Sequence, residues 1–244
     1  MINILSSNAS APSDLFVEVK RKNDEDNLQW LSRTLPDHEG KTLCVMVGGV
    51  NATSFRLRMA QSHVRSDLLP SYWSHVMLLE KITKNMASSP VYEISLEPAQ
   101  GFDFPPPSNG VQKSKLGQYR DIELYPNIAV LAVPVTIDEV KKALDRFQKQ
   151  RATLDAVDLM VRWLAYIWGV GDSQNPLLQG MGIPSAAMLE IVFGAAGYDL
   201  TPGLESRSSC PEAIWQAAKW WHEYYEDQNR VSLIGLYHIG HALE

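Results

Sequence analysis

The sequence predicts an α+β fold in which a small antiparallel sheet packs against helices. Three observations lead to this prediction. Short segments that are apolar or alternate in polarity, at 41–49, 75–82 and 90–98, have the length and pattern of strands. Longer segments with apolar residues at helical spacing occupy much of 136–228. Most of the helices follow the strands instead of alternating with them, which favours α+β over a parallel α/β sheet.

Two apolar segments are expected to form buried strands. KTLCVMVGG (41–49) is a short apolar run with Cys44 at its centre and two glycines at its end. DIELYPNIAVLAVPV (121–135) supplies a further strand or pair of strands. After the first of these segments, a helix is expected within 51–70, with Asn51 as its N-cap.

A hairpin is expected to follow that helix. One of its strands begins near His75, directly after the aromatic stretch PSYWS. The other, PVYEISLEP (90–98), alternates between two prolines, so Glu93, Ser95 and Glu97 share one face. Antiparallel pairing of the two strands would place that face beside His75.

The C-terminal half is predicted to be mostly helical. Thr136 followed by Glu139 matches a capping box and predicts a helix over 136–151. Helical spacing continues over 153–169, and another helix is expected within 182–200. The last long helix is expected to begin in the segment SSCPEAIWQAAKWW.

Length and composition indicate a globular protein with one main domain. The 244 residues are 45% hydrophobic and 20% charged, and the formal net charge is −6. We expect a polar lead-in over 1–40, a domain over 41–228 with a helical insertion around 136–200, and a C-terminal tail over 229–244.

The same properties argue against several classes of function. The pI of about 5.5 and the lack of a basic face exclude nucleic acid as the expected partner. No apolar run approaches the roughly 18 residues that a membrane span needs. No signal peptide is evident at the N-terminus, so a cytoplasmic location is expected. The two cysteines are far apart in sequence, which argues against a disulfide scaffold and for reduced thiols.

Cys210 lies where a nucleophile could be activated. In SSCPE, either Ser209 or Cys210 caps the last helix, because Ser209 and Glu212 fit a capping box while proline prefers the first helical position. Unpaired N–H groups and the helix dipole would then lower the thiol pKa and could also hold an oxyanion. The alternative is that Cys210 is a small buried hydrophobe.

Of the six histidines, His75 is the best candidate for a general base, because a strand end can hold an imidazole rigidly. His222 lies about three turns along the helix of Cys210 and is too far away. A carboxylate on the neighbouring strand, either Glu93 or Glu97, could orient the ring. His238 and His241 could pair on a turn, but no carboxylate or cysteine lies near them at metal-ligand spacing, so neither a metal nor a cofactor is expected.

The order of these motifs resembles the circularly permuted papain-like hydrolases, which are relatives of the NlpC-type peptidases and of the lecithin–retinol acyltransferase group. The motifs are S-H-V at 74–76, V-Y-E at 91–93 and S-C-P-E at 209–212, and the resemblance covers most of 40–225. It implies a permuted papain-like fold with Cys210 as the nucleophile, His75 as the general base and Glu93 as the orienting residue.

The expected function is therefore that of a cysteine hydrolase, meaning a peptidase or amidase, or of an acyltransferase. It would act through a thioester intermediate on the amide or ester bond of a peptide, a protein or a lipid ester. The alternative is an inactive papain-like module that binds a partner without catalysis.

Overall fold

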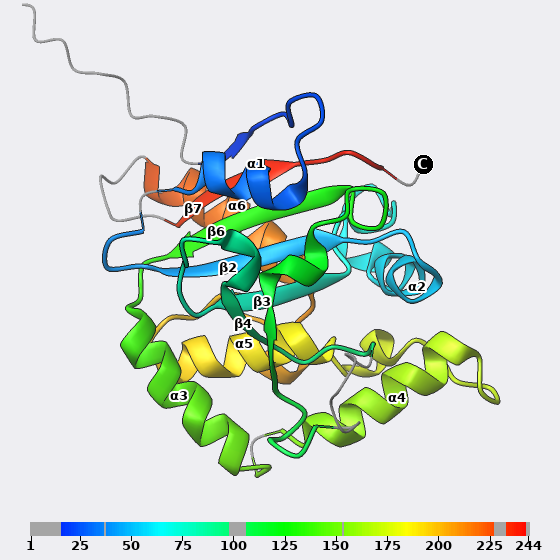
Figure 1. Cartoon of the computed structure of the whole chain (residues 1–244). Helices are drawn as coiled ribbons and strands as arrows, with labels where there is room; N and C mark the ends of the chain where they lie inside the picture. The colour runs from blue at the N-terminus through cyan, green and yellow to red at the C-terminus, as the bar shows by residue number, and fades with distance from the viewer. Residues whose placement is uncertain (1–15, 37, 98–105, 153, 227–232, 243–244) are drawn as a thin grey trace, which may run out of the picture.

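The computed structural model describes residues 16–36, 38–97, 106–152, 154–226 and 233–242, with the side chains of 221–226 left out of the description. These residues form a mixed α+β fold, as expected (Figure 1). The strands are β1 (Phe16–Glu18), β2 (Thr42–Gly48), β3 (His75–Leu79), β4 (Pro90–Glu93), β5 (Gln112–Lys115), β6 (Asn127–Val133) and β7 (Ile234–His238). The α-helices are α1 (Asn27–Thr34), α2 (Ala52–Ala60), α3 (Ile137–Lys149), α4 (Ala156–Trp168), α5 (Pro184–Ala195) and α6 (Pro211–Glu226).

All seven strands join one sheet in the order β1-β7-β6-β2-β3-β4-β5. Each neighbouring pair is antiparallel except β1 and β7, which are parallel. β2 and β6 lie in the middle of the sheet, and every residue of both is buried. Burial on both faces explains why these two strands are continuous apolar runs in the sequence and do not alternate.

The two faces of the sheet carry two separate hydrophobic cores. Val76 and Leu78 of β3 point into the larger core, which also holds apolar residues of α2, α3, α4, α5 and α6. Met77 and Leu79 point into the smaller core, which holds residues of α1 and of the short 3₁₀ turn Leu116–Tyr119. Figure 1 shows α1 on one side of the sheet and α3, α4 and α5 on the other.

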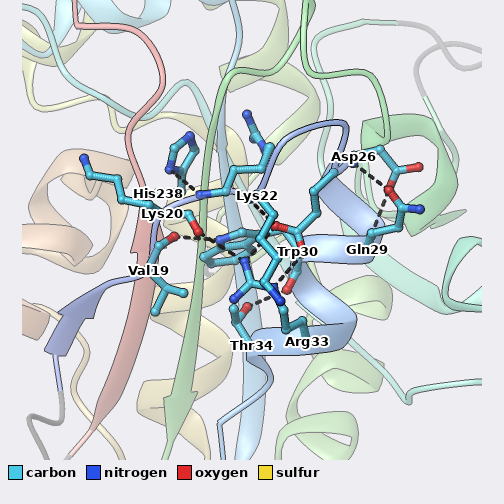
Figure 2. Close-up of polar contacts among 11 residues, drawn as sticks. Val19, Lys20, Lys22, Asp26, Gln29, Trp30, Arg33, Thr34 and His238 are labelled. Atoms are coloured by element: carbon cyan, nitrogen blue, oxygen red, sulfur yellow. Dashed lines mark hydrogen bonds and ion pairs between the residues drawn. The ribbon is translucent and has the colours of Figure 1, made fainter.

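The N-terminal region is more than the polar, irregular or weakly helical lead-in that the sequence predicted, because part of it belongs to the core. Trp30 of α1 is fully buried, and its indole N–H donates to the carbonyl of Val19 at 2.8 Å (Figure 2). Asp26 and Gln29 form a capping box at the start of α1. Because α1 buries one apolar face in the smaller core, tertiary packing makes this short helix stable.

An ion pair and a strand contact fix the same region to the sheet. Arg33 contacts both carboxylate oxygens of Glu25 at 2.7 Å, and this bidentate pair lowers the pKa of Glu25 to about 2 (Figure 2). The backbone N–H of Arg21 donates to Nδ1 of His238 in β7 at 3.3 Å. The expected C-terminal tail therefore contributes an interior strand of the sheet, and β1 pairs with it.

The expected elements of the middle region are confirmed, with shorter bounds. β3 begins at His75, and Leu79 and Leu78 pair with Val91 and Tyr92 of β4 in the expected hairpin. β4 ends at Glu93, although the alternating pattern in the sequence extends to residue 98. The capping box of Thr136 is present at the start of α3.

Candidate active site

His75 stands at one end of the sheet, where β3 begins. In the register of β2 with β3 it pairs with Val47, and its neighbour Ser74 donates a backbone N–H to the Val47 carbonyl at 2.9 Å. Side chains alternate along a strand, so the His75 ring points to the same face as Met77, the face covered by α1. The side chain is 13% exposed, which leaves one edge of a rigidly held imidazole accessible.

Glu93 is fully buried beside His75 and binds its ring. The Nε2 atom of His75 lies 2.7 Å from Oε2 of Glu93. The amide of Gln118 donates to Oε1 at 2.7 Å, and the hydroxyls of Ser114 and Tyr119 donate to Oε1 and Oε2. Four side chains therefore satisfy a carboxylate that has no access to water.

The surroundings of Glu93 keep it ionised. Burial alone would raise its pKa, but the hydrogen bond and the charge of His75, with the hydroxyls of Ser114 and Tyr119, outweigh burial, and the pKa is lowered. Tyr119 stays protonated and can donate, because burial and the charge of Glu93 raise its pKa well above the usual value.

These protonation states determine the tautomer of His75. An ionised carboxylate only accepts hydrogen bonds, so Nε2 must carry the proton that is donated to Glu93. In the neutral ring, Nδ1 then carries the lone pair. This is the arrangement in which a carboxylate orients a histidine for general-base chemistry.

His75 lines a cavity of about 210 Å³ at this end of the sheet. Besides His75, its polar lining comes from α2, from the residue before β3, from the segment after β4, from β5 and the turn after it, and from the loop before β6. These residues are Thr53, Ser54, Ser74, Ser95, Glu97, Gln112, Gln118, Tyr119 and Tyr125. Its apolar lining consists of Leu57, Ile94, Leu96 and Ile183. A concave site with an oriented imidazole and an apolar wall can accommodate one small organic group beside the base.

Glu97, the alternative orienting residue, lies in the same cavity but contacts a different group. Its Oε1 atom accepts a hydrogen bond from Nδ2 of Asn51 at 2.8 Å. Asn51 is the N-cap of α2, and its own Oδ1 accepts the backbone N–H of Ser54. The hairpin therefore brings Glu93, and not Glu97, to the imidazole of His75.

Cys210 is placed away from this pair. The residue directly precedes α6, and its carbonyl accepts the N–H of Ile214, so it occupies the cap position that proline at 211 favours. Its side chain is 1% exposed and packs in the larger core, on the face of the sheet opposite to the His75 ring. Cys210 is not among the residues that line the His75 cavity. The nucleophilic role of Cys210 stays a prediction.

The expected lowering of the Cys210 pKa is wrong for this structure. Burial raises the thiol pKa to about 12, and the backbone N–H groups of Ala213 and Glu212 offset only part of that effect. The helix start does supply N–H donors, as the sequence suggested. The thiolate would lose its hydration, because apolar side chains enclose it, and this cost outweighs the stabilisation that the N–H donors give.

Neither cysteine is therefore expected to react in the folded protein. Cys44 is also buried, and burial raises its pKa as well. At pH 8, iodoacetamide should leave both thiols unmodified in the native state and modify both in denaturant, as read by intact mass. Rapid native alkylation at Cys210 that is lost in His75→Gln would contradict this prediction and would indicate a conformation in which the two side chains meet.

The sequence did not single out the three residues that support Glu93. Ser114 lies on β5, which pairs with β4, and Gln118 and Tyr119 lie on the turn that follows. The segment QKSKLGQY that contains them has weak strand and helix patterns. A buried carboxylate needs several hydrogen-bond donors, so donors for Glu93 could be expected on the neighbouring strand. The sequence does not say which segment forms that strand.

The described ranges offer neither a cluster of metal ligands nor a membrane-spanning helix. No cluster of three or more His, Cys, Asp or Glu side chains there is arranged to hold a metal ion. None of the helices in those ranges is long and apolar enough to cross a bilayer. Comparison of the chain with protein-family models, with curated proteins and with solved structures finds no match.

Proposed function

We propose that this protein is a hydrolase or acyltransferase for an ester or amide bond, and that His75 is its general base. The observation that carries the proposal is the pair of His75 with the fully buried Glu93, which opens onto a cavity. Burying a carboxylate is costly unless it is fully hydrogen-bonded. Three donors hold this carboxylate, and the carboxylate in turn holds one imidazole in one tautomer, which is the kind of support that catalysis requires.

In the proposed reaction, Nδ1 of His75 takes the proton of an attacking O–H or S–H group. The attacking atom bonds to the carbonyl carbon of the substrate, and the carbonyl oxygen becomes an oxyanion. When the C–O or C–N bond breaks, His75 returns the proton to the leaving oxygen or nitrogen. Water, or an acceptor hydroxyl or amine, then releases the acyl group by the same proton transfers.

Two side chains at helix starts are candidates for the attacking group. Cys210 is the one expected from the sequence and from the resemblance to permuted papain-like enzymes, but its thiol is buried and its pKa is raised. Ser185 lies in the first turn of α5, and its buried Oγ has no hydrogen-bond partner among the described residues. α5 packs against β3 in the larger core, and Ile183, two residues before Ser185, lines the cavity. Ser185 itself, like Cys210, is not among the lining residues.

The test is acylation and turnover with p-nitrophenyl esters of increasing chain length. We expect release of p-nitrophenol to fall about 10²–10⁴-fold in His75→Gln, because general-base catalysis is worth that much. Glutamine keeps an N–H donor for Glu93, so this variant should fold. Intact mass and peptide mapping of a trapped acyl group then identify the nucleophile.

Each outcome of that test is informative. A His75-dependent acyl group on Cys210 would support the cysteine mechanism and the permuted papain-like arrangement. A His75-dependent acyl group on Ser185 would support the same chemistry with a hydroxyl nucleophile. Absence of both acylation and His75-dependent turnover over the whole ester series would overturn the proposal.

A binding module without catalysis is the second candidate. It is favoured by one observation, the separation of the only helix-start cysteine from the His75 cavity. In that case the His75–Glu93 pair would orient a hydrogen bond to a ligand. His75→Gln would then weaken ligand binding, and there would be no ester turnover to lose.

A further inference from the structure

The lining of the cavity beside His75 carries one carboxylate and no cationic side chain. Among the described lining residues Glu97 is the only carboxylate, and none is lysine or arginine. The ionised Glu93 lies behind the lining and bonds to the neutral ring of His75, so it adds to the negative charge at this end of the sheet. Arg58, which follows Leu57 in the chain, is fully buried and gives its guanidinium to three backbone carbonyls. Within the described ranges, no lysine or arginine lines the cavity beside Glu97.

Glu97 is held in place by neutral groups. The Asn51 amide donates to Oε1 at 2.8 Å, and the backbone N–H of Glu97 donates to Oγ of Ser95 at 3.1 Å. These bonds position the carboxylate without cancelling its charge. Tyr125 also lines the cavity, and burial, followed by the charges of Glu97, Glu93 and Asp121, raises its pKa to about 12.

The remaining lining suits a short alkyl chain. Leu57, Ile94, Leu96 and Ile183 supply apolar surface in the same cavity. Its volume of about 210 Å³ equals that of about seven liquid waters, which is smaller than the usual pocket for a drug-sized ligand. The space therefore matches one amino-acid side chain or one short ligand group.

We propose that this cavity binds a primary alkylammonium group, such as a lysine side chain, with Glu97 pairing with the ammonium and the apolar wall covering the alkyl stem. A half-buried carboxylate beside apolar surface should bind an alkylammonium ion more tightly than a neutral alcohol, and it should repel an anionic ligand. The inference rests on the proposed function, because it takes the His75 cavity as the substrate site. It adds that the substrate carries a cationic alkyl group beside the bond that reacts.

The experiment is titration of the whole protein with pentylammonium chloride, followed by NMR of the histidine ring protons and by calorimetry. Pentan-1-ol and pentanoate serve as the neutral and anionic probes of similar length. We expect pentylammonium to bind at least tenfold more tightly than pentan-1-ol, and pentanoate to bind least. Glu97→Gln should remove this preference, and it should fold because the Asn51 amide can still donate to the new side chain.

Asp145→Asn is the matched control, since Asp145 is an exposed carboxylate on α3 and its loss changes the net charge equally. It should bind pentylammonium like the wild type. Equal binding of pentylammonium and pentan-1-ol, no binding of either, or an unchanged preference in Glu97→Gln would overturn the inference.

The two proposals can fail separately. Pentylammonium binding that depends on Glu97 but is not accompanied by His75-dependent turnover would support the ammonium site and reject the enzyme. His75-dependent turnover that is indifferent to Glu97 and to charged probes would support the enzyme and reject the ammonium site.

Discussion

Replacing Glu93 with leucine is expected to destabilise the fold by about 3–5 kcal/mol, because several buried donors would lose their shared acceptor at a cost of about 1–3 kcal/mol each. Leucine would leave His75, Gln118 and the hydroxyls of Ser114 and Tyr119 without their shared acceptor. Ser114 and Tyr119 are buried and His75 is mostly buried, so water cannot fully replace their lost bonds, whereas Gln118 is exposed and can bond to water instead. The same change should abolish turnover, because nothing would then orient the imidazole.

The measurement is the free energy of unfolding by urea, combined with ester turnover. Glu93→Gln is the matched variant, because glutamine keeps the shape of the side chain and one acceptor oxygen. We expect it to cost roughly half as much stability as Glu93→Leu. Turnover should fall about 10³–10⁴-fold. Ser114→Ala removes one donor and should cost about 1 kcal/mol. Wild-type stability in Glu93→Leu would show that the four hydrogen bonds do not support the fold.

The contribution of Glu93 should depend on pH in a defined direction. Its pKa is lower in the folded protein than in the unfolded chain. The unfolded chain therefore binds the proton first as the pH falls, and the stability that Glu93 contributes is complete above the unfolded pKa. It is lost as the pH falls through the folded pKa, so the difference in stability between wild type and Glu93→Gln should narrow in acid.

Replacing Gly182 with alanine is the second change with a large expected effect. The new Cβ would lie closer to the Ser209 carbonyl oxygen than any real contact, and 2.7 Å and 2.8 Å from the carbonyl oxygen of Arg207 and the nitrogen of Ser209. All three are backbone atoms and cannot rotate away. The Gly182 N–H also donates to the Arg207 carbonyl at 2.7 Å, so the two segments cannot separate without losing that bond. We expect a loss of about 3 kcal/mol or more.

Gly194→Ala is the control in the neighbouring helix. Gly194 lies near the end of α5, and no atom would lie within 4 Å of its new Cβ. Alanine should leave stability unchanged or increase it by up to about 1 kcal/mol, because glycine is a poor helix former. Urea unfolding of both variants provides the comparison. A Gly182→Ala variant as stable as Gly194→Ala would mean that the segment before α6 is free to move away from α5.

The displacement expected in Gly182→Ala also affects the site. Gly182 precedes Ile183, which lines the cavity, and Ile183 donates its N–H to the carbonyl of Ser209, next to Cys210. A variant that folds but holds the two segments apart should therefore change the wall of the cavity. Its pentylammonium affinity and its ester turnover would report that change directly.

Local sequence patterns predicted many elements because short-range physics decides them. Thr136 and Glu139 determine the start of α3 through hydrogen bonds within one turn. The hairpin of β3 and β4 follows from two β-forming runs joined by a polar segment. Period-two alternation on β4 was enough to place Glu93 on the face of His75.

Long-range packing decided the rest. Residues 16–36 have the polar composition of a lead-in, yet Trp30 of α1 is buried in the smaller core. The Arg21 N–H, just before α1, also donates to His238, a residue more than 200 positions away in sequence. β7 lies in a mildly apolar tail, and only its pairing with β6 and β1 makes it a strand. Pairing between distant segments leaves little trace in the sequence of either one.

The sequence by itself determined the α+β class, the order of the central elements, and the position of His75 on a hairpin beside either Glu93 or Glu97. The tertiary structure chose Glu93. Only the tertiary structure decided which core encloses Cys210 and which side chains enclose Glu93. The reason is that the pKa and reactivity of a side chain depend on burial and on partners from other segments. A cysteine at a helix start has the same sequence signature whether its thiol faces a cleft or, as here, a hydrophobic core.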